Sequence, residues 1–280
     1  MRWAIGIVLV TLAVLRAGPC GGGCGGKAAP VRIATFNIED FPKDRRQIDG
    51  AFDEIARVGA EIVAVQEIVD PGLFQAEAVN RLGGAWQFAA ISTAPYGMHP
   101  THHLGVLFDR RTWTLIDVMP HDETRLGSTH KPTLEVRLVP AGGGDVLRLL
   151  VVHLKAGGEN ADIRARQLRA LATIIGYRQE RTIVLGDFNA TGDADRASIT
   201  ALARSTSLVW ASEPLACSAF WSRDDGCFRS RLDHVLMWQA PAAVSVAGGC
   251  ATHGCEWEAS CPNYAHEVSD HCPVVVELRP

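Results

Sequence analysis

The chain has 280 residues, a formal net charge of −4 at pH 7 and 47% hydrophobic residues. This length is sufficient for one large domain with a substantial core, and the sequence contains no internal repeat and no second linker that would indicate further domains. The slightly acidic balance does not indicate nucleic-acid binding. It does not exclude it either, because a bound metal ion and a local basic patch can hold a phosphate in an acidic protein.

Residues 1–17 are predicted to be a signal segment. Arg2 gives a positive start, and the uncharged apolar stretch that follows is too short to span a bilayer. Residues 18–30 are rich in glycine and typical of a flexible linker. We therefore expect an exported protein, secreted or periplasmic, with a single domain over residues 31–280. A lipid anchor at Cys20 is the alternative, although the proline before this cysteine argues against it.

Downstream of the linker, short apolar runs alternate with stretches of helical periodicity. This alternation is typical of a layered α/β domain in which helices cover mixed strands. A glycine-rich hairpin turn is predicted at residues 141–145. In the helix predicted after residue 160, Arg164, Arg166 and Arg169 are expected to face away from the apolar side. The predicted helices are 47–58, 161–177 and 195–203, and the predicted strand pairs are 105–108 with 114–118 and 133–138 with 146–152.

Two polar motifs follow the first two apolar runs of the domain. Asn37 comes just past the first run, and Glu67 just past the second, at residues 62–65. Their amide and carboxylate oxygens are hard ligands of the kind that Mg²⁺ binds. The alternatives are a turn-capping role for Asn37 and a surface position for Glu67. A glutamate beyond a buried strand is costly unless it is solvated or paired, and a metal ion meets that requirement.

Two further apolar runs end in His153 and in the Gly-Asp-Phe-Asn sequence at residues 186–189. Gly186 permits a tight exit from the strand, and the spacing of two residues points the side chains of Asp187 and Asn189 in the same direction. An Asx-turn is the alternative for the aspartate, and a hydrogen-bonded position at the core edge is the alternative for the histidine. We expect these motifs at the same rim of the sheet as the first two.

Two motifs in the C-terminal third are expected to act together. Asp233 precedes His234, and Asp270 precedes His271. A carboxylate beside an imidazole fixes its tautomer and raises its basicity. Because neighbouring strand residues alternate faces, His234 is expected to point away from the site. Lys131 is a candidate point charge for a phosphate, with an exposed loop position as an equal alternative. Further candidates for the rim, or for an exposed loop, are His99, His102 and His103.

This ordered series of motifs resembles the endonuclease/exonuclease/phosphatase family, the deoxyribonuclease I-like group, over nearly the whole predicted domain. The resemblance implies an α/β fold, a four-layer sandwich of two packed mixed β-sheets flanked by helices, with the site at one end. It also implies residue roles. Metal binding is assigned to Asn37, Glu67 and Asp270, phosphate contact to His153 (as an imidazolium), Asn189 and Lys131, activation of the attacking water to Asp187, and general-base or phosphate-contact chemistry to His271, oriented by Asp233.

The function that this resemblance implies is hydrolysis of phosphodiester bonds with Mg²⁺ as cofactor, or Mn²⁺ or Ca²⁺ in its place. We expect a monomeric extracellular nuclease that acts on DNA or RNA. One alternative is a sphingomyelinase-like lipid phosphodiesterase or phosphatase, whose membrane contact would use Trp221, Trp238 or Trp257 unless these residues pack in the core. Another is a non-catalytic binding module, against which the intact set of polar residues argues.

Six cysteines lie in the last third of the chain. An even, clustered set behind a signal segment predicts disulfides in an oxidising compartment. Cys217 with Cys227 is the expected local pair, because the residues between them favour a turn. A zinc site with Cys250, Cys255, Cys261 and two neighbouring histidines is the alternative, although the paired Cys-x-x-Cys spacing of structural zinc sites is absent.

Overall fold

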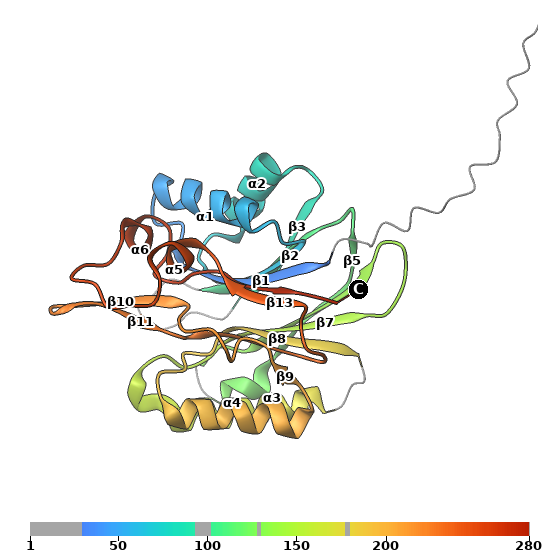
Figure 1. Ribbon diagram of the computed structural model, residues 1–280. Helices are drawn as coiled ribbons and strands as arrows, with labels where there is room; N and C mark the ends of the chain where they lie inside the picture. The colour runs from blue at the N-terminus through green and yellow to red at the C-terminus, as the bar shows by residue number, and fades with distance from the viewer. Residues whose placement is uncertain (1–29, 93–101, 128–129, 177–179, 280) are drawn as a thin grey trace, which may run out of the picture.

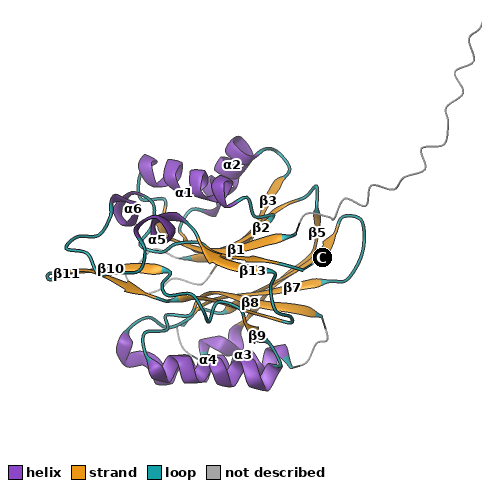
Figure 2. Cartoon of the chain, viewed as in Figure 1, coloured by secondary structure: helices purple, strands orange, loops and turns teal. Residues whose placement is uncertain are grey.

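Two six-stranded mixed sheets pack face to face in the computed structural model, with helices on both outer faces (Figure 1; Figure 2). The four-layer arrangement expected from the sequence is therefore confirmed. The structure describes residues 30–92, 102–127, 130–176 and 180–279. The predicted signal segment, nearly all of the linker with Cys20, and His99 lie outside these residues. In the described part of the chain, no helix has the length and apolar character needed to cross a membrane.

The first sheet and the helices on its outer face are formed by β1 (Arg32–Phe41), α1 (Arg45–Val58), β2 (Ile62–Ile68), α2 (Pro71–Leu82), β3 (Trp86–Ser92), β4 (His103–Asp109), β13 (Ala243–Val246) and β14 (Val274–Glu277). Its strand order is β13-β14-β1-β2-β4-β3. β1 and β2 run parallel, and α1 makes the crossover that a parallel pair requires. Asp44 caps α1 by accepting the Gln47 N–H (3.0 Å), and Gly59, at φ 61°, ends it.

The second sheet and its helices are formed by β5 (Trp113–His121), η1 (Asp122–Arg125), β6 (Thr133–Pro140), β7 (Leu147–His153), η2 (Gly158–Asn160), α3 (Ala161–Ile175), β8 (Arg181–Asp187), α4 (Asp193–Thr206), β9 (Val209–Trp210) and β12 (Asp233–Met237). Its strand order is β5-β6-β7-β8-β12-β9. β7 and β8 are parallel, with α3 as their crossover. Each sheet thus contains one parallel strand-helix-strand unit at its centre.

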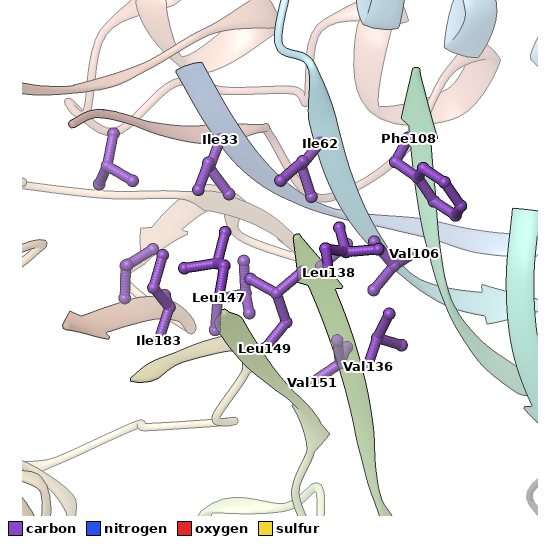
Figure 3. Packing of buried hydrophobic residues seen from close by; sticks show 14 of the residues in the cluster. Ile33, Ile62, Val106, Phe108, Val136, Leu138, Leu147, Leu149, Val151 and Ile183 are labelled. Carbon is purple, nitrogen blue, oxygen red and sulfur yellow. The ribbon is translucent and has the colours of Figure 1, made fainter. Parts of the chain in front are cut away.

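The two sheets pack through the apolar side chains of their inner faces (Figure 3). Ile33 and Ile62 of the first sheet lie across from Val136 and Leu149 of the second, and none of the four is exposed. Because side chains alternate along a strand, the intervening residues point outward and pack against the helices. Burying a side chain of this size stabilises the fold by roughly 1.5–3 kcal/mol. This apolar layer therefore fixes how the ends of the two sheets meet.

Several predicted elements are longer than expected or carry side chains in different surroundings. The third predicted helix extends further at both ends, as α4, and α2 and β3 were not predicted. The predicted pairing of strand 105–108 with strand 114–118 is wrong, because β4 and β5 lie in different sheets. Arg166 and Arg169 are exposed as expected, but Arg164 is buried. Its guanidinium binds both carboxylate oxygens of Asp195, at 2.7 and 2.8 Å. This ion pair joins α3 to α4, so the apolar pattern alone misjudged the surroundings of Arg164.

A small disulfide-bonded lobe extends from one end of the sandwich (Figure 1). Its elements are β10 (Ala219–Arg223), β11 (Gly226–Ser230), α5 (Gly248–His253) and α6 (Asn263–Glu267). The disulfides join Cys217 to Cys255, Cys227 to Cys261 and Cys250 to Cys272. The expected pair of Cys217 with Cys227 is wrong. Cys227 lies opposite Ser222 in the hairpin, which keeps it roughly 17 Å along the strand from Cys217. Because these sulfurs bond to one another, the zinc alternative is also wrong.

Candidate active site

The candidate active site lies where the parallel strand pairs of the two sheets end. The regular β1–β2 ladder runs to Asn37, opposite Gln66, and the β7–β8 ladder ends at His153, opposite Asp187. The two ends meet, because Nδ2 of Asn37 donates a hydrogen bond to Oδ2 of Asp187 at 3.2 Å. The structure therefore brings together motifs that are 150 residues apart in the chain.

Asn37 and Glu67 lie at an irregularity shared by β1 and β2, rather than just past the ends of the two strands. Glu39, Asp40 and Glu67 have positive φ angles of 37°, 55° and 62°, a conformation that costs non-glycine residues roughly 1–3 kcal/mol each. Oδ1 of Asn37 accepts the Glu39 N–H (3.0 Å), and its Nδ2 donates to Oε1 of Glu67 (3.1 Å). Asn37 therefore orients carboxylates in this structure, and its role as a metal ligand stays a prediction.

Gly186, at the end of β8, delivers Asp187 and Asn189 to the site. Its φ is 140°, and a Cβ there would lie 2.0 Å from the carbonyl oxygen of Val152 on β7, so only glycine fits. The Asn189 N–H donates to Oδ1 of Asp187 at 2.8 Å, and Nδ2 of Asn189 donates to Oδ2 at 3.0 Å. Asn189 thus fixes the orientation of Asp187, and its expected contact with a phosphate oxygen stays a prediction.

The carboxyl group of Asp187 is buried among charged neighbours. Burial raises its pKa to about 7; His271 opposes this effect, whereas Asp233 and Glu67 add to it. A carboxylate in such surroundings is stabilised in its charged form by a nearby cation. The electrostatics of this residue therefore favour a bound positive charge in the site.

Asp233, Ser218 and His271 form a hydrogen-bonded chain beside β12. Oδ2 of Asp233 lies 2.8 Å from Nδ1 of His271, and the Ser218 hydroxyl donates to the same oxygen at 2.8 Å. Nε2 of His271 faces Asp187, 3.9 Å from its Oδ2. Burial alone would lower the pKa of His271, but Asp233 and Asp187 outweigh it and raise this pKa well above its ordinary value. These hydrogen bonds fix the orientation of the His271 imidazole.

Lys131 lies beside His153 and not in an exposed loop. Its Nζ is 2.9 Å from Nδ1 of His153. Nε2 of His153 lies 3.5 Å from Oδ2 of Asp187 and 3.6 Å from Oε1 of Glu67. Burial and the charge of Lys131 lower the pKa of His153 well below its ordinary value, which favours the neutral ring rather than the imidazolium that the resemblance implied. Burial also lowers the pKa of Lys131.

Asp270 lies at the partly buried edge of the site. Its N–H donates to Oε2 of Glu39 at 3.0 Å, and its Oδ1 is 3.9 Å from Nε2 of His271. This oxygen is buried and has no hydrogen-bond partner. Burial raises the pKa of Asp270 to about 7, against the opposing effect of His271. An unsatisfied carboxylate oxygen beside other carboxylates is suited to a hard cation.

Other polar residues support the site, and sequence reasoning missed Ser218 and Glu39 because neither belongs to a motif. The side chain of Ser218 holds the aspartate next to the imidazole, and that of Glu39 holds a backbone N–H. His102 lies at the rim, where its Nε2 contacts Asp40. His103 instead lies in β4, with Nδ1 2.9 Å from a carbonyl oxygen of β2.

His234 points away from the site, as its alternation with Asp233 along β12 predicts. Its Nδ1 accepts a hydrogen bond from Nε1 of Trp210 (3.2 Å). Burial lowers the pKa of His234 to about 3. His234 therefore belongs to the core between β12 and the helices of the second sheet.

The sequence pattern of the Endonuclease/Exonuclease/phosphatase family matches residues 34–271, a span that includes every residue of the site. The chain belongs to this family. The human Nocturnin catalytic domain with bound sulfate anion is 18% identical, with a TM-score of 0.66 over 89% of this chain and 93% of that chain. D. rerio TDP2 complexed with single strand DNA product is 16% identical, with a TM-score of 0.67 over 89% and 99%. A family protein from Bacteroides thetaiotaomicron is 14% identical, with a TM-score of 0.62 over 88% and 96%. At these identities the likeness shows the fold alone, and the comparison with curated proteins gives no match.

Proposed function

We propose that this protein is an exported, Mg²⁺-dependent phosphodiesterase that cleaves nucleic acid. The observation that carries the proposal is the convergence of Glu67, His153, Asp187 and His271 from both sheets. Family membership supports hydrolysis of phosphoric esters. The DNA product bound to D. rerio TDP2 supports a nucleic-acid substrate by fold-level analogy. The three disulfides support an oxidising compartment.

The residues at the site fit a divalent cation. Ligand atoms of Glu67, His153 and Asp187 lie within 4.8 Å of one another, and the unpartnered Oδ1 of Asp270 adds a further oxygen. We assign the cation to Glu67 and Asp270, with Asn37 beside them. When bound, Mg²⁺ supplies positive charge beside the leaving oxygen and lowers the pKa of a water molecule. Mn²⁺ and Ca²⁺ share its preference for oxygen ligands and are the alternatives.

The residues of the chain supply orientation and proton transfer for this reaction. Hydrolysis joins a water oxygen to phosphorus and breaks the bond to the leaving alcohol, which takes up a proton. Asp187 is positioned to accept a proton from the attacking water. His271, held at Nδ1 by Asp233, presents Nε2 to the phosphoryl group. Lys131 and the adjacent His153 contact the non-bridging oxygens, where negative charge grows in the transition state.

A plasmid-nicking assay with Mg²⁺ and with EDTA, run beside a sphingomyelin assay, tests this proposal. Glu67→Gln keeps the shape of the side chain but removes its charge, and we expect turnover to fall by roughly 100-fold or more. Glu213→Gln, which removes an exposed carboxylate outside the site, is the matched control and should nick plasmid normally. Full activity after exhaustive chelation would contradict the metal assignment.

The same assay separates the alternatives in substrate and class. Hydrolysis of sphingomyelin without nicking would replace the nuclease with a lipid phosphodiesterase. If neither substrate is hydrolysed, but the protein binds nucleic acid, the fold serves as a binding module instead.

A further inference from the structure

The disulfide lobe carries a ribbon with one buried and one exposed face, which no step of the proposed hydrolysis uses. β10 pairs with β11, and Glu258 forms an antiparallel bridge with Cys227 on the other side of β11. Phe220 and Cys227 point into the lobe and are buried. Figure 1 shows this ribbon projecting beyond the sheets on the left. Because side chains alternate along a strand, the residue that follows each of these two in its strand points to the opposite, exposed face.

The exposed face carries an aromatic row that we define as Trp221, Phe228 and Trp257. Trp221 lies opposite Phe228 in the β10–β11 register, with ring centroids 6.5 Å apart. The antiparallel bridge one residue away places Trp257 opposite Phe228 from the other side. The two tryptophans are 51% and 57% exposed, and the Arg223 guanidinium lies 4.0 Å from the centre of the Trp221 ring. The two indoles are thus each about half exposed, and the Arg223 guanidinium lies over one of them.

The aromatic row shares a face of the ribbon with the candidate catalytic histidine. Ala219, the first residue of β10, forms an antiparallel bridge with His271, so their side chains project from the same face. Trp221 follows two residues later and projects from that face again, about 7 Å further along the strand. The Phe220 N–H also donates to the carbonyl oxygen of Asp270 at 2.7 Å. The ribbon is thus attached directly to the rim of the site.

We propose that the aromatic row stacks on unpaired bases of a single-stranded nucleic acid whose phosphate lies in the active site. This inference rests on the proposed function and deepens it by naming single-stranded substrate. Unpaired bases stack on exposed aromatic rings with little sequence preference. Arg223, whose guanidinium lies over the Trp221 ring, adds a positive charge for the phosphate backbone next to the stacked bases.

A membrane surface is the competing partner for exposed tryptophans, but the tip of the ribbon argues against it. The turn between β10 and β11 consists of Asp224 and Asp225. A ribbon that entered a bilayer tip-first would carry two carboxylates into the lipid, which is unfavourable. Trp238, the third candidate for membrane contact, is packed against the core with Arg181 over its ring.

Fluorescence anisotropy with a short fluorescein-labelled oligothymidylate tests the proposal on the full chain. EDTA in the buffer prevents cleavage during the titration. We expect Trp221→Ala and Trp257→Ala each to raise Kd about tenfold, which corresponds to ~1.4 kcal/mol. Trp221→Phe retains an aromatic face and should recover most of the affinity. Ile116→Ala removes another exposed apolar side chain, 44% exposed on β5, and should bind like the unaltered protein.

Kinetics with Mg²⁺ supply a second measurement, which would not change if the aromatic row were only structural. Loss of stacking should raise KM for the oligonucleotide more than it lowers kcat, because ground state and transition state lose the same contact. If the unaltered protein cleaves nucleic acid but both alanine variants match its Kd and KM, the stacking proposal is overturned and the proposed function stands. If the unaltered protein neither binds nor cleaves nucleic acid, both fail. Retention on sphingomyelin vesicles that depends on Trp221 would then assign the row to a lipid surface.

Discussion

Removing single disulfides separates the stabilising role of the lobe from its role at the site. The Cys250–Cys272 bridge adjoins His271 in sequence, whereas the Cys227–Cys261 bridge lies beneath the exposed ribbon. Each bridge can be replaced by a pair of serines. The two variants should be nearly equal in stability but unequal in activity.

The stability effect follows from the lengths of the closed loops. The sequence separations are 22 residues for Cys250–Cys272 and 34 for Cys227–Cys261. Chain entropy then gives losses of about 3.4 and about 3.8 kcal/mol in the free energy of unfolding at 25 °C. Equilibrium denaturation in urea, monitored by tryptophan fluorescence, measures this difference.

The activity effect follows from what the bridges hold. The Cys272 N–H donates to the carbonyl oxygen of Ser218 at 2.7 Å, so this cysteine anchors the segment that carries His271. A displacement of about 1 Å at a catalytic group lowers turnover by on the order of 10²-fold. We therefore expect a large loss of kcat for the Cys250/Cys272 variant only, measured under conditions where both variants are folded. Equal losses of kcat would refute this reasoning, and an unchanged free energy of unfolding in either variant would refute the entropic estimate.

Three further predictions concern single residues. Asp233→Asn should lower kcat by roughly 100-fold, because the amide no longer orients the imidazole, while thermal unfolding shows a retained fold. Burial lowers the pKa of His234 to about 3 from 6.5, so the unfolded chain binds a proton that the folded chain does not. The contribution of His234 to stability should fall by about 2 kcal/mol between pH 7 and pH 5, so the difference in unfolding free energy between the unaltered protein and His234→Asn, measured by urea denaturation, should fall by that amount over this range. Gly186→Ala should destabilise by ~3 kcal/mol or more, whereas Gly59→Ala, with a positive φ but no clash, should cost ~1 kcal/mol; equal losses by denaturation would contradict the steric argument.

The fold and the location of the site were predictable because they depend on local patterns that repeat along the chain. Apolar runs that end in polar residues predicted β2, β7 and β8, and strands of this kind bring their ends to one rim. Strand-end position and the family resemblance together singled out Glu67, His153 and Asp187, and the structure brings their side chains together. The alternation of Asp233 and His234 was sufficient to place one at the site and the other in the core.

The remaining features depend on contacts between distant segments, which no local pattern records. Arg164 is buried because Asp195, 31 residues later, meets its guanidinium between two helices. The cysteine pairs depend on how the lobe folds over the ribbon, so spacing alone suggested a wrong partner for Cys217. Ser218 was missed because a serine after a cysteine has no distinguishing pattern, and only the tertiary fold places its hydroxyl on Asp233.

The central position of β1 bears on the timing of activity during synthesis. β1 lies between β2 and β14, and the Ser269 hydroxyl donates to the carbonyl oxygen of Asn37, 232 residues earlier. At translation rates of about 5–20 residues per second, the ribosome needs roughly 10–50 s to make the intervening chain. Throughout that interval the nascent polypeptide holds Glu67 and then Asp187 but lacks His271. On the proposed assignment of the site, the protein stays inactive until the segment that carries His271 has been made and has reached the first strand.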